Sequence, residues 1–264
     1  MDYELLAVLF MIGGIVGVMA GLLGIGGGII VVPSLLWLLP KAGIGPDNIM
    51  HIALATSLAT IIVTSTSSVR SHLKNGNVDL FVVKWLIPGV VSGGFLGAYV
   101  AELVPAELLP KIFSVILLTL ALQMILSVKT TAAREMPGKV VTLLFGVLIG
   151  TVSTLAGIGG GALTVPFLSR FGVEMRKAIG SASACGFMIA VSGMLGFILH
   201  STGSENLPDY SVGYVYLPAL LAIVAASVFT TRIGVSLASR LPTRSLKKVF
   251  ALFLLFVAGK MLFI

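Results

Sequence analysis

The chain opens with an apolar run, residues 5–39, that is interrupted near its middle by Gly24-Ile25-Gly26-Gly27-Gly28. As one helix these 35 residues would be about 50 Å long, whereas the hydrocarbon core of a bilayer is about 30 Å thick. Three consecutive glycines weaken a continuous helix because glycine loses the most backbone freedom on folding. The run is therefore predicted to bend or to turn back on itself.

The composition sets the class of protein. Hydrophobic residues make up 57% of the 264 residues and charged residues only 10%, against about 25% charged residues in a typical soluble domain. The apolar runs have the lengths of helices and show no sustained alternation of apolar and polar residues, which argues against an outer-membrane barrel. We predict an all-α, polytopic membrane helix bundle with apolar segments at 5–39, 50–69, 81–104, 108–128, 140–169, 178–199, 212–237 and 246–264.

The glycine break occurs twice. Gly157-Ile158-Gly159-Gly160-Gly161 repeats the first break 133 residues later, and a proline follows the last glycine by five residues each time, at Pro33 and Pro166. Downstream of the two breaks, Thr56 and Ser181 fall in similar Ala- and Ser-rich steps, at matching places in the two repeats. The sequence thus predicts two membrane repeats, 1–132 and 133–264, each with one glycine-broken segment and three further helices.

The distribution of basic residues favours a hairpin at each break. If the broken segment crossed the membrane once, the 17 Lys and Arg residues would divide seven against ten between the two sides. If it folds back as a re-entrant hairpin, fourteen lie on one side and three, Lys41, Lys111 and Lys260, on the other. This positive-inside bias places both termini outside and relates the repeats by inverted topology. The basic residues form no aromatic-interleaved patch, so we expect no nucleic-acid partner.

The breaks are the predicted functional site. Non-helical backbone inside a membrane must be satisfied internally, so the breaks should face the protein interior. A helix that starts directly after each break would aim free N–H groups and the positive end of its dipole there, which suits an anion. The alternative is that the glycines only allow close helix packing. The candidate substrate-binding residues, together with the nearby hydroxyl of Thr154, are Gly24, Gly26, Gly27, Gly28, Thr56, Ser57, Gly157, Gly159, Gly160, Gly161, Ser181 and Ser183.

Ionisable residues are few and lie near the predicted segment ends, where snorkelling or loop placement accounts for them. They are His51, Arg70, His72, Glu102, His200 and Arg232. Among them Arg70 and His72 are candidates for a gate or for a coupling proton, because histidine titrates near neutral pH. Tyr214 and Tyr216 suit interfacial anchoring. We expect no metal and no cofactor, since Cys185 is the only cysteine and no nucleotide-binding motif occurs.

The paired Gly-Ile-Gly-Gly-Gly and proline motifs, the step Ala55-Thr56-Ser57-Leu58 and the turn Asn75-Gly76-Asn77-Val78-Asp79 resemble those of the TauE/SafE permeases. The resemblance covers nearly the whole chain. It implies a transporter of the bacterial or archaeal inner membrane that exports sulfite, sulfoacetate or a related small oxyanion. An anion channel and a non-transporting scaffold stay open as alternatives. An intramembrane enzyme is disfavoured, because His51, Glu102 and His200 form no ligand or nucleophile–base spacing.

Overall fold

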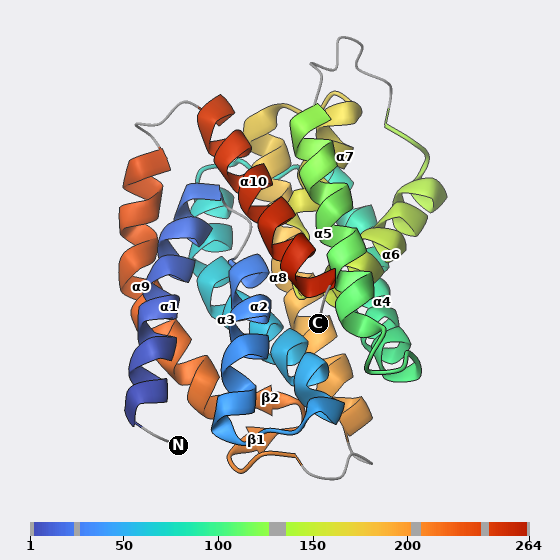
Figure 1. Cartoon of the computed structure of the whole chain (residues 1–264). Coiled ribbons are helices and arrows are strands. Elements are labelled where there is room, and N and C mark those ends of the chain that lie inside the picture. Colours follow the sequence, from blue (N-terminus) through green and yellow to red (C-terminus); the bar gives the residue numbers. More distant parts are fainter. Residues whose placement is uncertain (1–2, 24–26, 127–135, 202–206, 239–242, 263–264) are drawn as a thin grey trace.

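The computed structural model describes residues 3–23, 27–126, 136–201, 207–238 and 243–262 (Figure 1). Within these ranges the chain forms ten α-helices, one short 3-10 turn and one two-stranded antiparallel hairpin. The predicted all-α membrane bundle is confirmed.

The order of the helices repeats along the chain. The first half contains α1 (Tyr3–Leu23), α2 (Gly28–Leu38), the 3-10 turn η1 (Leu39–Ala42), α3 (Pro46–Lys74), α4 (Leu80–Leu103) and α5 (Leu109–Leu126). The second half contains α6 (Lys139–Leu155), α7 (Gly161–Arg170), α8 (Met175–His200), β1 (Ser211–Val212), β2 (Val215–Tyr216), α9 (Leu217–Ala238) and α10 (Thr243–Leu262). In both halves a long helix, a short helix with an internal proline and three long helices follow one another.

Each glycine break separates two helices. The run 5–39 divides into α1 and α2, and the run 140–169 divides into α6 and α7. In Figure 1, α1 rises from the N-terminus and α2 runs back down towards the same end of the molecule. The first broken segment therefore turns back, as its length predicts.

Local sequence signals set the starts of the next two helices. Pro46 opens α3, a position where its missing N–H removes no helical hydrogen bond. Asp79 precedes α4 and its carboxylate accepts a hydrogen bond from Val82 N at 3.3 Å. The run 212–237 differs from the prediction of one helix: its first residues form the β1–β2 hairpin, with Gly213 at φ +56, and α9 begins only at Leu217.

Helices of one half pack against helices of the other. The most extensive contacts join α1 with α9 and α4 with α6, and α3 also packs on α8 and α5 on α10. Because α6 and α9 stand in the second half where α1 and α4 stand in the first, the first two pairs are equivalent. The two halves therefore interlock along their length.

Small residues allow the α4–α6 contact. A Cβ added to Gly89 would lie 3.0 Å from Gly146 Cα, and one added to Gly93 would lie 3.0 Å from Gly150 Cα. The glycines recur every four residues on both helices, which is the spacing that lets membrane helices approach closely. Some of the chain's glycines therefore have the packing role that the sequence left open.

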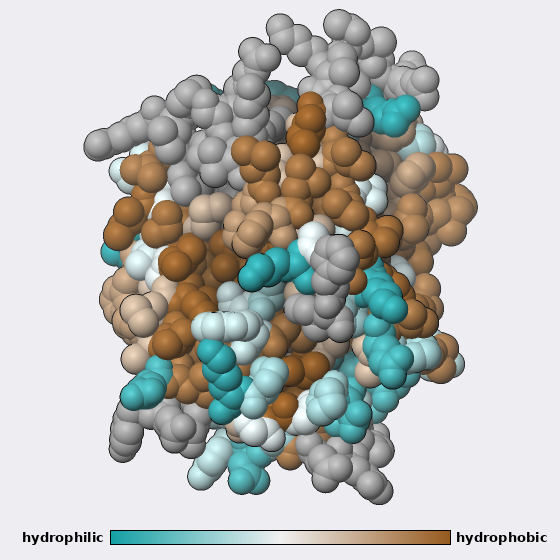
Figure 2. Space-filling view, in the orientation of Figure 1, coloured by the Kyte–Doolittle hydropathy of each residue, from teal (hydrophilic) through white to brown (hydrophobic). Residues whose placement is uncertain are grey.

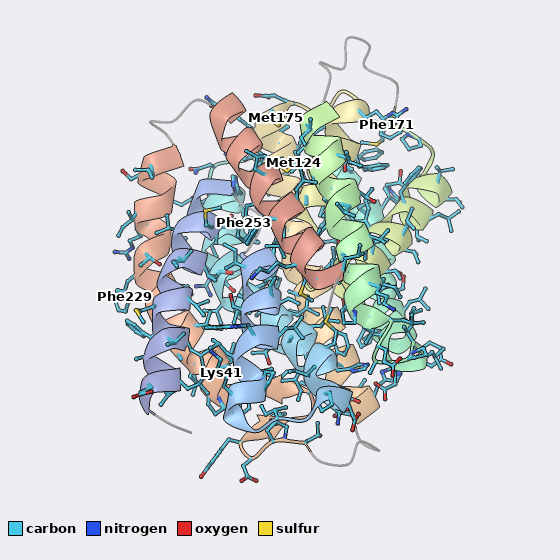
Figure 3. The ribbon with its side chains drawn as sticks, viewed as in Figure 1. Lys41, Met124, Phe171, Met175, Phe229 and Phe253 are labelled. Atoms are coloured by element: carbon cyan, nitrogen blue, oxygen red, sulfur yellow. The ribbon has the colours of Figure 1, made fainter. Side chains whose placement is uncertain are left out.

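The outside of the bundle is apolar. In the described residues four helices are long and apolar enough, by length and composition, to cross a membrane: α3, α4, α8 and the Leu217–Gly234 part of α9. Figure 2 shows hydrophobic side chains over large parts of the visible face. Phe229 is 76% exposed and points away from α9 in Figure 3. An exposed apolar surface of this extent fits a protein surrounded by lipid.

Candidate functional site

The two glycine breaks meet inside the molecule. Ser57, on α3, donates a hydrogen bond from its hydroxyl to the carbonyl oxygen of Gly157 at 2.8 Å and lies 3.4 Å from that of Gly28. A Cβ on Gly28 would collide with the Gly157 carbonyl oxygen. All three residues are buried. The first break, the second break and α3 are thus in direct contact, which the repeat predicted only as a consequence of symmetry.

Left-handed glycines start the two short helices. Gly27 (φ +74) precedes α2 and Gly160 (φ +67) precedes α7, and no side chain caps either helix. Only glycine adopts this conformation at little cost. Since Gly28 and Gly161 are buried, the positive ends of both helix dipoles lie inside the protein. This is the geometry that the sequence predicted for the breaks.

Near the second break lie buried hydroxyls for which the described part of the chain supplies no hydrogen-bond partner. Within the described residues, Ser153 Oγ, Thr154 Oγ1 and Thr164 Oγ1 are buried and make no hydrogen bond. A Cβ on Gly160 would lie 3.5 Å from Ser153 Oγ and 3.7 Å from Thr164 Oγ1. Leaving a buried hydroxyl unpaired costs about 1–3 kcal/mol. These two donors and the start of α7 converge on one place.

The first break lacks this polar lining. On the offset of 133 residues, Ala20 matches Ser153 and Val31 matches Thr164. A Cβ on Gly27 would lie 3.5 Å from the Ala20 Cβ and 2.7 Å from a Val16 methyl group. The left-handed glycines of the two breaks are therefore similar, whereas among the described residues the hydroxyls without a hydrogen-bond partner lie beside the second break.

The matched residues Thr56 and Ser181 make matched contacts. Thr56 Oγ1 accepts a hydrogen bond from the backbone N–H of Tyr216 at 3.0 Å, and Ser181 Oγ accepts one from Asp79 N–H at 2.9 Å. Tyr216 directly precedes α9 and Asp79 directly precedes α4, its counterpart in the other half. Each hydroxyl thus holds the start of a helix from the opposite half, in place of lying open towards a break.

The remaining predicted residues have various positions. Ser183 Oγ contacts Ser68 Oγ at 3.2 Å and donates to Ile179 O at 3.0 Å. Gly159 accepts a hydrogen bond from Gly161 N, which opens α7. Gly24 and Gly26 lie outside the described residues.

Arg70 and His72, the candidates for a gate or a coupling proton, lie near the end of α3, about 20 Å along the helix from Ser57. The structure does not bring them to the breaks.

Two groups were missed from the sequence. Ser153 and Thr164 could have been found from their distance to the glycine break, because Ser153 lies in the last turn of α6 before the break and Thr164 in the first turn of α7 after it. The interfacial position predicted for Tyr214 and Tyr216 is wrong, because these side chains are only 1% and 6% exposed. No linear pattern signals their burial, which arises from packing between distant helices.

No group of three or more His, Cys, Asp and Glu that could hold a metal lies in the part of the chain that the structure describes. The donors at the breaks are backbone amides and hydroxyls, which suit an anion and carry no full charge.

An all-helical bundle with an apolar exterior and glycine breaks buried at its centre defines a helical membrane protein. Residues 9–261 match the family described as Sulfite exporter TauE/SafE, and the chain belongs to this family. The resemblance seen in the glycine motifs is thereby confirmed.

Curated relatives agree with this assignment. A "Probable membrane transporter protein" of Haemophilus influenzae is 42% identical over 255 residues, which cover 95% of this chain and 96% of that protein. Proteins with the same description from Methanocaldococcus jannaschii and Bacillus subtilis are 29% and 25% identical, covering 92% and 100% of this chain and 90% and 98% of their own lengths. No solved structure matches the chain.

Proposed function

We propose that this chain is a secondary transporter that exports a small sulfur-containing oxyanion, such as sulfite or sulfoacetate, across the inner membrane. The observation that carries the proposal is a pair of hydroxyls, Ser153 and Thr164, which have no hydrogen-bond partner among the described residues and lie beside the buried start of α7. The family description and the names of the relatives support transport as the activity.

The second break supplies the donors that an oxyanion needs. The anion lies near Gly160, where the absence of a side chain permits close approach to the main chain. The hydroxyls of Ser153 and Thr164 donate to its oxygens, and the helix dipole of α7 stabilises its charge. Gly157 and Gly28, joined by Ser57, form the wall towards the first half. The proposed site thus uses the glycines of both breaks but the hydroxyls of only one.

Inverted repeats 1–132 and 133–264 give this site access to both sides in turn. The reversal of direction between α1 and α2 in Figure 1 supports the hairpin topology, which separates fourteen basic residues from three and puts both termini outside. Lys41 is one of the three basic residues that this topology places outside. It lies near the lower end of the molecule in Figure 3, whereas Phe171 and Met175 lie near the upper end.

Two cross-half hydrogen bonds stand towards opposite ends of the molecule. The Thr56–Tyr216 bond lies towards the end that carries β1 and β2, and the Ser181–Asp79 bond towards the end where α7 leads into α8 (Figure 1). Rocking of one half against the other breaks one bond while it keeps the other. This exposes the central site to one side at a time.

The proposal is tested by efflux of sulfite and sulfoacetate from liposomes that contain the purified protein. We expect saturable efflux, and Ser153→Ala and Thr164→Val should each raise the half-saturating concentration about tenfold, since a hydrogen bond to a charged ligand is lost. Ser192→Ala is the matched control, because the buried Ser192 hydroxyl donates to Met188 O of its own helix at 2.9 Å. No efflux above that of empty liposomes would overturn the proposal, and unitary currents would identify a channel.

A further inference from the structure

A buried histidine lies at the end of the molecule that carries the β1–β2 hairpin. His51, in the second turn of α3, is 6% exposed. Its Nε2 lies 3.1 Å from the carbonyl oxygen of Ala101 and 3.8 Å from Oε2 of Glu102, both near the end of α4. Its Nδ1 is buried and has no hydrogen-bond partner among the described residues. An imidazole with one bonded and one unpartnered nitrogen is placed to accept a proton.

Aromatic side chains of the second half complete the surroundings of His51. The ring of Tyr214 stacks on the imidazole with centroids 5.0 Å apart and planes 25° apart, and Phe197 of α8 meets it edge-on at 6.3 Å. The Tyr214 hydroxyl donates to both carboxylate oxygens of Glu102, at 3.2 and 3.3 Å. A stacked ring face favours a cation, and the carboxylate supplies the opposite charge.

Glu102 connects this buried group to solvent. Its side chain is 33% exposed, whereas that of His51 is 7% exposed. The carboxylate is therefore in contact with water at this end of the molecule, and its negative charge lies beside the buried imidazole. A proton bound by the imidazole adds one positive charge beside this negative charge, so the pair becomes neutral overall.

The hairpin also connects His51 to the glycine breaks. Tyr214 stacks on His51, and Tyr216, two residues later, donates its backbone N–H to Thr56. Thr56 is followed by Ser57, which bonds Gly157 O. A change in the charge of His51 thus acts on the same short hairpin and the same helix that contact the two breaks.

We propose that His51 and Glu102 form a proton-binding site whose occupancy is coupled to the anion at the glycine breaks. The coupling rests on the proposed transport function, whereas the binding of the proton does not. Nδ1 accepts the proton while Nε2–H continues to donate to Ala101 O. The imidazolium is then held by the Glu102 carboxylate and the face of Tyr214. Coupling between the two ligands is reciprocal: the anion changes proton affinity by the factor by which the proton changes anion affinity.

Other titratable groups near this site do not replace the pair. Asp47, one turn before His51 on α3, is exposed. Tyr216 keeps its proton, because burial and the neighbouring charge of Asp209 raise its pKa above the ordinary value. His200, on α8, has its Nδ1 2.7 Å from Gly196 O of its own helix and its ring beside Tyr99. His200 is therefore a control at the same end of the molecule.

The proton site is tested by nitrogen NMR of the full chain with labelled histidines, in a His72→Gln, His200→Gln background that leaves His51 alone. We expect the His51 signal to change with pH as the imidazole takes up a proton. Glu102→Gln should move the midpoint to lower pH, because the charge that holds the imidazolium is removed, and Tyr214→Phe should move it less. A His51 signal that is independent of pH, or a midpoint that Glu102→Gln leaves unchanged, would overturn the site.

Coupling is tested with sulfoacetate, whose sulfonate stays ionised throughout the His51 titration. Saturating sulfoacetate should shift the pH midpoint of the His51 titration. In His51→Gln, the factor by which a pH gradient stimulates liposome efflux should fall about tenfold or more. His200→Gln should keep it. If sulfoacetate leaves the His51 midpoint unchanged and His51→Gln keeps normal gradient-driven efflux, the coupling is contradicted. Absence of any efflux from the unaltered protein contradicts the proposed function instead, and the NMR titration then decides whether His51 binds the proton.

Discussion

The hydroxyl of Ser57 donates a 2.8 Å hydrogen bond to the carbonyl oxygen of Gly157, a residue 100 positions away in the sequence. The bond ties α3 of the first half to the backbone of the second glycine break. A backbone carbonyl freed from its helix needs a donor inside a membrane protein. Ser57 supplies that donor without introducing a charge.

Replacement of Ser57 should weaken the contact between the breaks. Ser57→Ala leaves the Gly157 carbonyl without this donor, and we expect a loss of about 1–3 kcal/mol and a lower unfolding temperature in detergent, with reduced anion efflux. Ser92→Ala is the control, because the exposed Ser92 hydroxyl bonds carbonyls of its own helix at 2.9 Å. Equal unfolding temperatures for the two variants would show that the Ser57 bond contributes little.

Gly160 should be required for more than its backbone conformation. Gly160→Ala places a Cβ against Ile189 and beside Ser153 and Thr164, at φ +67. Gly43→Ala carries the same conformational penalty, about 1–2 kcal/mol, at φ +79 but in open space. We expect both variants to lose some stability and only Gly160→Ala to lose sulfoacetate efflux. Similar sulfoacetate efflux from the two variants would contradict an anion site at the second break.

The two cross-half bonds should control opposite ends of the molecule. In a Cys185→Ala chain, which then has no native cysteine, Thr60→Cys places one thiol a turn beyond Thr56. Thr56→Val should increase its labelling by an impermeant maleimide from the β1–β2 side, and Ser181→Ala should increase it from the other side. An identical pattern in both variants would contradict the assignment of one bond to each end.

Close packing of α4 on α6 should depend on Gly93. Gly93→Leu pushes a side chain into Val147 and Gly150, and overpacking of this kind costs about 1–3 kcal/mol or more. We expect little monodisperse protein after size-exclusion chromatography. Gly259→Leu, at a position with nothing within 4 Å, should behave as the unaltered chain. Normal recovery of Gly93→Leu would show that the helices can separate here without loss of the fold.

Much of the fold could be predicted because its signals are local. The predicted run 50–69 corresponds to α3 at Pro46–Lys74, and both breaks divide helices where the glycines occur. The start of α9 within the segment 212–237 could not be predicted, because the residues of the strands and of the helix are equally apolar there. For the proposed anion site, the sequence predicts the glycines but not the hydroxyls of Ser153 and Thr164, since serine and threonine in apolar helices usually bond their own backbone.

The sequence by itself determined that the chain is a helical membrane protein with a glycine motif that recurs after 133 residues, because apolar length and glycine position are properties of the linear chain. Only the tertiary structure decided which polar groups have partners. Ser153 and Thr164 have no hydrogen-bond partner within the described ranges. Thr56 and Ser181 accept hydrogen bonds from the backbone of the opposite half, and His51 contacts Glu102 and Tyr214. These contacts join residues from different helices, and hydrogen bonding depends on distance and burial, which the order of residues along the chain does not contain.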